Sequence, residues 1–399
     1  VKLNSISTLG EKAPPDSLQK LVAPEAPLWY QKPGNWENGP TSAYYKGLMS
    51  ILTEKPYPLR VVQASCTNPL TATRNPRRVA EALKKLDFFF VMDTCWASHM
   101  DYADIVLPAC TDYEHSHQLE VRHCRKGSWI GIYNRVIEPL GESRSDWQFF
   151  LDLAVKMGYG ADFWNGNMDT CLREQLAPSG ITLEELRNSP RGIFVPGKEA
   201  PPPPQYRRYA QLFKDLPHAK VQCYNEVIGG RENNEGSGCL PYLPTYCGPP
   251  EGLARTPELA KKYPLIISDV HAHRLSQHSF YHNLPYLRQL QPYPWLKINP
   301  ATARRYGIKD GDWVRVESPH GWSKFRAACF EGIAPDVLMT KRGWSQPCRE
   351  LGLPGYSEFD GGSEVNNLYN SDYRFFDKFY SQMPKQSLVR ISRFEEGPI

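Results

Sequence analysis

The sequence lacks the short motifs that mark the commonest cofactor and hydrolase sites. Its 399 residues contain no G-x-G-x-x-G, no Walker A sequence, no G-x-S-x-G and no H-E-x-x-H. None of the ten cysteines belongs to a C-x-x-C pair, so the spacings of structural zinc and iron–sulfur sites are missing as well. Scattered cysteines in a chain of this length indicate a reduced protein rather than a disulfide scaffold.

Long apolar runs and a marked excess of one charge are also absent. No hydrophobic stretch approaches the roughly 18 residues that a transmembrane helix needs, and the net charge is only +4, from 47 basic and 43 acidic residues. We therefore expect no direct membrane span and no nucleic-acid partner. The first residues show neither an initiator Met nor the regions of a signal peptide, and we expect the chain to be part of a longer protein.

Proline, by contrast, is abundant. It accounts for 36 of the 399 residues, well above the usual share of about 5%. Because Trp and Tyr are plentiful too, these prolines indicate long ordered connections rather than disorder. The composition along the chain predicts four parts: an extended N-terminal segment at 1–55, an incomplete α/β domain at 56–195, a Pro/Gly-rich linker at 196–258 and a second domain at 259–399.

The α/β domain is predicted from alternating strand and helix patterns. Residues 59–64 and 87–92 are typical of buried strands. Residues 76–86 between them favour a helix with Asn75 as its N-cap, and residues 105–108 form a further strand. Strand–helix–strand at this spacing predicts a parallel sheet.

Asn68 and Asp93 follow predicted strand ends, where such sheets bind their ligands. Asp93 could merely cap a turn, or its carboxylate could accept two N–H bonds from an edge such as that of guanine. Asp146 begins a helix predicted from Ser145 to Gly158. It is either a further ligand contact or an acid favoured by the helix dipole.

The second domain reads as a small β-barrel of roughly 140 residues, because short strands recur between turn signals. A short helix is expected at 300–305. The predicted strands are 263–268, 313–318, 323–330, 337–339 and 387–391.

A histidine-rich run extends from His271 to His282. An H-x-H pair after a strand can bind a metal ion, but Asp269 is the one nearby carboxylate at ligand spacing. A polar loop that lines a ligand cavity is the favoured interpretation.

Several stretches, in order, resemble the carboxy-terminal half of the bis-molybdopterin-guanine-dinucleotide oxidoreductases, the dimethyl sulfoxide reductase family. The resemblance covers nearly the whole chain. The matching stretches are Lys55–Pro58, Cys66–Leu70, Val91–Asp93, Ala103–Ala109, Glu138–Glu142, Ser145–Trp147, Tyr263–Ile267, Ile298–Pro300 and Gly307–Val314.

The resemblance implies a Rossmann-like parallel-sheet domain followed by a six-stranded double-psi barrel. It implies a bis-molybdopterin guanine dinucleotide cofactor with Mo or W, a [4Fe–4S] cluster upstream, a small-molecule substrate and an iron–sulfur electron-transfer subunit as partner. The cofactor-binding residues it implies are Asn68, Met92, Asp93, Asp146, Asp269, His271, Arg274, Ser276, Asn366 and Lys385. His278 and His282 would face the substrate as proton donors, and no residue of this chain would bind the metal.

The chain also departs from the family pattern. Residues 114–135 lack an acidic-Gly-Thr/Tyr motif found in many relatives, and the loop at 274–283 is most similar to the branch of arsenate and polysulfide reductases and acetylene hydratase. The metal ligand and cluster cysteines of the family lie upstream, so this part alone should be inactive. Three functions stay open: an oxidoreductase, a non-redox hydratase or transhydroxylase, and a non-catalytic scaffold subunit of an electron-transfer complex.

Overall fold

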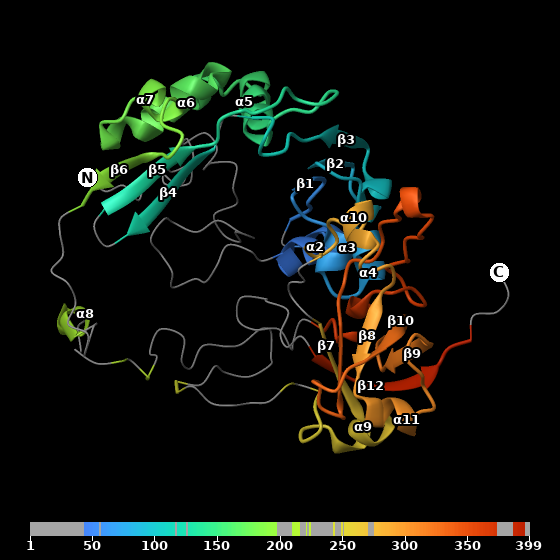
Figure 1. Ribbon diagram of the computed structural model, residues 1–399. Coiled ribbons are helices and arrows are strands. Elements are labelled where there is room, and N and C mark those ends of the chain that lie inside the picture. The colour runs from blue at the N-terminus through green and yellow to red at the C-terminus, as the bar shows by residue number, and fades with distance from the viewer. Residues whose placement is uncertain are drawn as a thin grey trace. The chain divides into compact units, whose positions relative to one another are not determined.

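The structure is a computed structural model that describes most of the chain from residue 44 onward (Figure 1). The described residues are 44–55, 57–115, 118–124, 127–197, 210–215, 221, 223–224, 242–243, 249, 251–269, 275–372 and 386–395. They belong to two compact units. One includes residues 92–94 and 107–227, and the other includes residues 39–91, 95–106 and 228–399. No helix in these ranges is long and apolar enough to cross a bilayer.

The predicted parallel sheet is confirmed and has the strand order β1-β2-β3. Its elements are β1 (Val61–Ser65), α3 (Pro69–Ala72), α4 (Pro76–Leu83), β2 (Phe88–Asp93), the 3₁₀ helix η4 (Ser98–Tyr102) and β3 (Ile105–Pro108). Asn75 caps α4 as expected, since its side chain accepts a hydrogen bond from the Arg78 amide. The buried face of α4, including Val79 and Leu83, packs in one core with Phe89 and Val91 of β2.

Residues 44–53, which the sequence placed in an extended segment, form helix α2 (Tyr44–Thr53). This stretch contains no proline, unlike the residues before it, and places Leu48, Ile51 and Leu52 at helical spacing. Leu48 is buried in the same core as α4. Tertiary packing of one apolar face therefore accounts for this helix.

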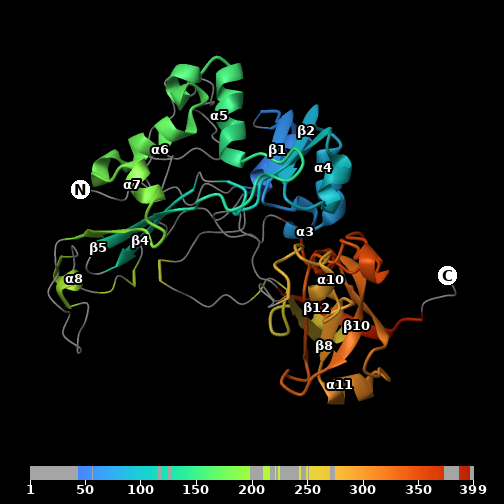
Figure 2. The ribbon, with the colours of Figure 1, turned by 45° about the horizontal axis from the view of Figure 1, so that its top comes forward.

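A second, antiparallel sheet was not predicted. It consists of β4 (Leu119–Cys124), β5 (Gly127–Ile132) and β6 (Ile193–Pro196), with β5 in the middle. Ile130 of β5 is buried in a core shared with nearby helices (Figure 2). These elements are α5 (Asp146–Lys156), η5 (Gly160–Gly166), α6 (Met168–Leu176), η6 (Ala177–Ser179) and α7 (Leu183–Arg187). Arg122, His123 and Trp129 are exposed, so the strands bury only one face and give a weak apolar signal.

Glu114 organises the loop that precedes this sheet. Its carboxylate accepts hydrogen bonds from the Thr111 amide and hydroxyl, both at 2.7 Å, from the Leu140 amide at 2.6 Å and from the Ser143 hydroxyl at 3.3 Å. The hydrogen bonds from Thr111 and Leu140 lower the pKa of Glu114 to about 2. One carboxylate thus joins two loop segments about 26 residues apart.

The second domain is a closed barrel of six strands in the order β10-β8-β11-β7-β12-β9, which confirms the expected fold class. The strands are β7 (Leu265–Asp269), β8 (Trp295–Ile298), β9 (Trp313–Ser318), β10 (Gly321–Cys329), β11 (Val337–Thr340) and β12 (Gln386–Arg393). Strands β7 and β11 run parallel, as do β8 and β10. The remaining helices are α8 (Ala210–Asp215), α9 (Pro257–Lys262), α10 (Pro285–Arg288), α11 (Pro300–Arg305), η7 (Arg349–Leu351) and η8 (Val365–Leu368).

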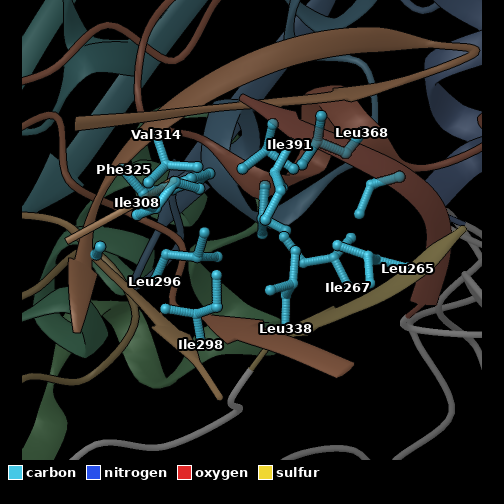
Figure 3. Close-up of a cluster of buried hydrophobic side chains, with 14 of the residues drawn as sticks. Leu265, Ile267, Leu296, Ile298, Ile308, Val314, Phe325, Leu338, Leu368 and Ile391 are labelled. Atoms are coloured by element: carbon cyan, nitrogen blue, oxygen red, sulfur yellow. The ribbon is translucent and has the colours of Figure 1, made fainter. Parts of the chain in front are cut away.

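The interior of the barrel is filled by aliphatic side chains from all six strands (Figure 3). Val314 and Val316 of β9, Phe325 of β10 and Leu338 of β11 are fully buried. Along β9 and β11, buried residues alternate with partly exposed ones, which is the period-two pattern of a strand with one face inside. The barrel is therefore a packed core and not a pore.

We predict that Leu338→Ala destabilises the barrel by about 2–5 kcal/mol, because it leaves a cavity in the fully buried centre. Native-state hydrogen exchange of the barrel amides measures this free energy for one unit of a larger protein. The matched control is Val337→Ala on the partly exposed face of the same strand, which should cost about 1 kcal/mol or less. Equal costs for the two variants would contradict the packing described for β11.

We predict that Glu114→Gln lowers the thermal midpoint of unfolding at pH 7, because the amide cannot accept all four hydrogen bonds as a carboxylate does. The folded-state pKa is below the ordinary value of 4.5, so the ionised carboxylate stabilises the fold above pH 4.5 and loses this effect as the pH falls toward 2. The difference between wild type and variant should therefore narrow below about pH 4.5. Glu142→Gln, at an exposed position nearby, should show no such pH-dependent difference.

Candidate functional site

Asn68 lies between β1 and α3, at the carboxyl end of its strand. It occupies the N-cap position of α3, but its side chain makes no capping hydrogen bond. The residue is only 4% exposed, and within the described part of the chain neither its amide oxygen nor its amide nitrogen has a hydrogen-bond partner. A buried polar group without a partner costs about 1–3 kcal/mol. This side chain is therefore suited to a polar group that the described residues do not supply.

Asp93 ends β2 and directly follows Met92, which is 2% exposed. One oxygen of the Asp93 carboxylate accepts a hydrogen bond from the Thr94 amide at 2.7 Å. This is the local turn contact that the sequence offered as the alternative role, and it fixes the direction of the carboxylate. The main-chain oxygen of Asp93 accepts a hydrogen bond from the Ala109 amide, just after β3.

Asp146 belongs to the same compact unit as Asp93. Ala109, which is bonded to Asp93, also forms a β-bridge with Arg144, two residues before Asp146. Asp146 begins α5, and burial raises its pKa. Its Oδ1 is buried with no hydrogen-bond partner among the residues that the structure describes. The hydroxyl of Ser145, the predicted cap, also makes no capping bond.

Asn366 lies on η8 after the barrel's fifth strand and is 4% exposed. Its amide nitrogen donates to the Thr71 main-chain oxygen at 2.7 Å, and its own main-chain oxygen accepts from the Asn75 amide at 3.2 Å. These contacts hold α3 and the start of α4 against the barrel segment. The cofactor contact of Asn366 stays a prediction; in the structure its side chain supports α3, which begins directly after Asn68.

Asp269 ends β7, and its side chain is 3% exposed. Its carboxylate accepts a hydrogen bond from the Tyr369 hydroxyl at 3.1 Å and lies 3.6 Å from the Arg342 guanidinium. Two protein groups therefore already engage this predicted ligand-binding residue. His271, Arg274 and Lys385, also predicted from the sequence, lie outside the described residues.

Ser276, His278 and His282 belong to the loop of residues 275–282, which we call the histidine loop. Ser276 is buried, His278 is partly exposed and His282 is 3% exposed. The His282 Nε2 lies 3.2 Å from the main-chain oxygen of His278. Because a carbonyl oxygen only accepts, Nε2 carries the proton in this contact. Among the described residues, no three His, Cys, Asp or Glu side chains form a group that could bind a metal ion.

Sequence reasoning missed three charged residues near the histidine loop: Lys341 and Glu364, which are buried, and Arg342, which is partly buried. Burial lowers the pKa of Lys341 to about 7 and raises that of Glu364 to about 8. One sequence feature could have indicated them: the adjacent basic residues Lys341 and Arg342 follow closely after the predicted strand at 337–339. Charges there would need internal partners or unusual pKa values.

Two family models match the chain, and together they span more than half of it. Residues 37–156 match "Molybdopterin oxidoreductase", and residues 265–379 match "Molydopterin dinucleotide binding domain". The first range contains Asn68, Asp93 and Asp146, and the second contains the histidine loop and Asn366.

Curated relatives extend the similarity. The chain is 27% identical to acetylene hydratase of Syntrophotalea acetylenica over 91% of this chain and 46% of that protein. It is 29% identical to a dimethyl sulfoxide/trimethylamine N-oxide reductase of Cereibacter sphaeroides over 70% of this chain and 35% of that protein. The chain is 26% identical to dopamine dehydroxylase of Eggerthella lenta over 75% of this chain and 35% of that protein. The chain thus spans about half or less of the length of these relatives.

A solved structure has the same fold: acetylene hydratase from Pelobacter acetylenicus superposes with a TM-score of 0.72 and 22% identity, over 92% of this chain and 49% of that one. Both matched models, and the relatives that share them, agree with the order of motifs in the sequence. The chain belongs to the molybdopterin oxidoreductases of the dimethyl sulfoxide reductase family.

Proposed function

We propose that this chain is the cofactor-binding part of an oxidoreductase that uses a molybdenum or tungsten bis-molybdopterin guanine dinucleotide. The observation that carries the proposal is the buried side chain of Asn68, which has no hydrogen-bond partner among the described residues and lies at the carboxyl end of a parallel strand. Ligands of open α/β sheets bind at this edge. An amide with both donor and acceptor unsatisfied suits the mixed hydrogen-bonding edge of a nucleotide.

Asp93 and Asp146 would hold the guanosine end. A carboxylate can accept two N–H bonds from the N1 and N2 positions of guanine, and the Thr94 amide fixes the direction of the Asp93 carboxylate. Asp146 offers a second carboxylate in the same unit, whose buried Oδ1 has no hydrogen-bond partner within the described part.

The bound cofactor would supply a metal that changes oxidation state while an oxygen or sulfur atom, or two electrons, moves to or from a small-molecule substrate. The histidine loop would form part of the substrate pocket. His278 is better suited than His282 to donate a proton, because His282 is buried and its Nε2–H points at a carbonyl oxygen. An upstream [4Fe–4S] cluster and an iron–sulfur partner subunit belong to this proposal as the route for electrons.

A second candidate function is a hydratase, in which the metal acts as a Lewis acid without net redox change. The observation that favours it is the similarity to acetylene hydratase over 91% of the chain. Relatives with reductase names cover less of the chain, at 70–74%. The two functions share the same cofactor residues and differ in whether turnover needs an external electron acceptor or donor.

We predict that Asp93→Ala in the full-length protein weakens retention of the cofactor by about 5- to 150-fold, the equivalent of 1–3 kcal/mol for unpaired guanine donors. The measurement is metal content by mass spectrometry together with guanine nucleotide released by acid hydrolysis. The matched control is Asp87→Ala at the exposed residue that directly precedes the same strand, which should keep the wild-type content. Equal cofactor content in both variants would rule out the guanine contact, and a wild-type protein without pterin or metal would indicate a non-catalytic scaffold.

We predict that His278→Ala lowers kcat by roughly 10²–10⁴-fold, as expected for loss of a general acid, while His123→Ala on exposed β4 leaves it unchanged. Turnover is measured in the full-length enzyme with and without an electron acceptor or donor. Turnover that requires neither would establish the hydratase function. An unchanged rate in His278→Ala would show that this histidine transfers no proton in the limiting step.

A further inference from the structure

Two parallel strands end together at one end of the barrel. Strand β11 pairs with β7 so that Leu338 lies opposite Ile267 and Thr340 opposite Asp269. Residue 341 therefore begins beside the end of β7, the strand that precedes the histidine loop in the sequence. The contact between the Arg342 guanidinium and the Asp269 carboxylate, at 3.6 Å, continues this pairing beyond the strands.

Lys341 contacts the histidine loop directly. It is fully buried, and its Nζ is hydrogen-bonded to the hydroxyl of Ser276. No carboxylate of the described residues forms an ion pair with it. A buried amine without a carboxylate is costly to maintain, and burial lowers its pKa to about 7. Its hydrogen bond to Ser276 is the contact that explains why a lysine occupies this position.

Gly343 touches the loop through its backbone. Its φ is +90°, and a Cβ at this position would lie 2.7 Å from the Ser279 Cα and 2.8 Å from the carbonyl carbon and oxygen of His278. On the other side, the Gly343 amide donates to the buried Glu364 carboxylate at 2.9 Å. The main chain at residue 343 is therefore held between Glu364 and the histidine loop.

Trp344 completes the row of contacts. Its ring centroid lies 4.4 Å from that of His282, and its Nε1 donates to the Lys341 main-chain oxygen at 3.0 Å. The buried guanidinium of Arg288 lies 5.2 Å from the Trp344 ring centroid and donates to the His282 main-chain oxygen at 3.5 Å. Residues 341, 343 and 344 thus meet residues 276, 278–279 and 282 in order.

The conformation of the histidine loop needs such support. His278 and Tyr281 have φ values of +53° and +75°, in the left-handed region that residues with a Cβ adopt at an energetic cost. Conformations of this kind persist where the surrounding structure fixes them, and they concentrate at functional sites. His278 is the residue whose side chain would act on the substrate.

We propose that residues 341–344, which we call the supporting segment, position the histidine loop, with Lys341 and Gly343 as positioning residues for His278 and His282. Its catalytic meaning rests on the proposed function of His278 as a proton donor. The supporting segment contacts the loop through one buried amine, one backbone approach and one ring contact. Loss of any of these frees the loop from its strained conformation.

The test uses the full-length protein and a pair of glycine variants. Gly343→Ala places a methyl group against His278 and Ser279, whereas Gly352→Ala, also at positive φ (+63°), meets nothing within 4 Å. Both variants carry the same kind of backbone strain, and only the first pushes on the loop. The readout is the rate at which diethyl pyrocarbonate modifies His278 and His282, followed by mass spectrometry of the peptides. We expect Gly343→Ala to raise the rate at buried His282 by roughly fivefold or more, and Gly352→Ala to match wild type.

A second variant series keeps the proposal testable if Gly343→Ala fails to fold. Lys341→Met preserves length and removes the donor to Ser276, so both histidines should react faster than in wild type. Lys341→Arg retains a donor and should restore rates close to wild type. Rates in folded Lys341→Met or Gly343→Ala equal to those of wild type would overturn the proposal, as would failure of Lys341→Arg to rescue.

Metal and pterin content is measured in the same samples. A cofactor-free wild-type protein would contradict the proposed function. The modification rates of His278 and His282 are a separate readout, and they test whether the supporting segment positions the loop. In loaded enzyme, loss of positioning should lower kcat with KM little changed, because the reacting group is displaced rather than removed.

Discussion

The parallel pairing of β7 with β11 is the constraint on which the candidate pocket depends. This pairing helps to close the barrel around a core of fully buried aliphatic residues. It also fixes where the ends of the two strands lie. Asp269 and Thr340 lie opposite one another in this pairing, so the supporting segment begins beside the end of the strand that precedes the histidine loop in the sequence. A shift of register by one residue would turn the buried Leu338 outward and separate the two segments.

A second junction ties the barrel to the parallel sheet. Arg74 donates to the Asn370 main-chain oxygen at 2.8 Å and lies 5.3 Å from the centroid of the Tyr369 ring, whose hydroxyl donates to Asp269. Asn366 supplies the bond to Thr71 in α3. Through these contacts the helix that follows Asn68 and the strand that precedes the histidine loop are parts of one hydrogen-bonded assembly.

The elements with strong local signals could be predicted from the sequence. Helix α4 has Asn75 and Pro76 at its start, α11 has Asn299 and Pro300, and β9 alternates along its length. The sheet of β4, β5 and β6 was missed because its strands are polar on one face and one pairs with a segment more than sixty residues away. Strand β8 was missed because prolines at 292, 294 and 300 enclose its four residues and favour a loop.

Those candidate site residues that lie at the ends of strands could be predicted from the sequence. Asn68 and Asp93 follow strand ends that local pattern alone indicates, and both lie where expected. Asn366 was placed on the right segment, but its contact with Thr71 depends on a residue 295 positions away. The burial of Lys341 and Glu364 follows from packing of distant segments, which local sequence does not encode.

That separation of 295 residues has a consequence for the order in which the protein is made. Residues 39–91 and 228–399 belong to one compact unit, and the chain between them contributes to the other. At about 5–20 residues per second, a ribosome completes Asn366 roughly 15–60 s after Thr71. During that interval the helices that flank Asn68 exist without the barrel that anchors them. The apolar surface that these helices share with the barrel segment stays uncovered until that later part of the chain has been made.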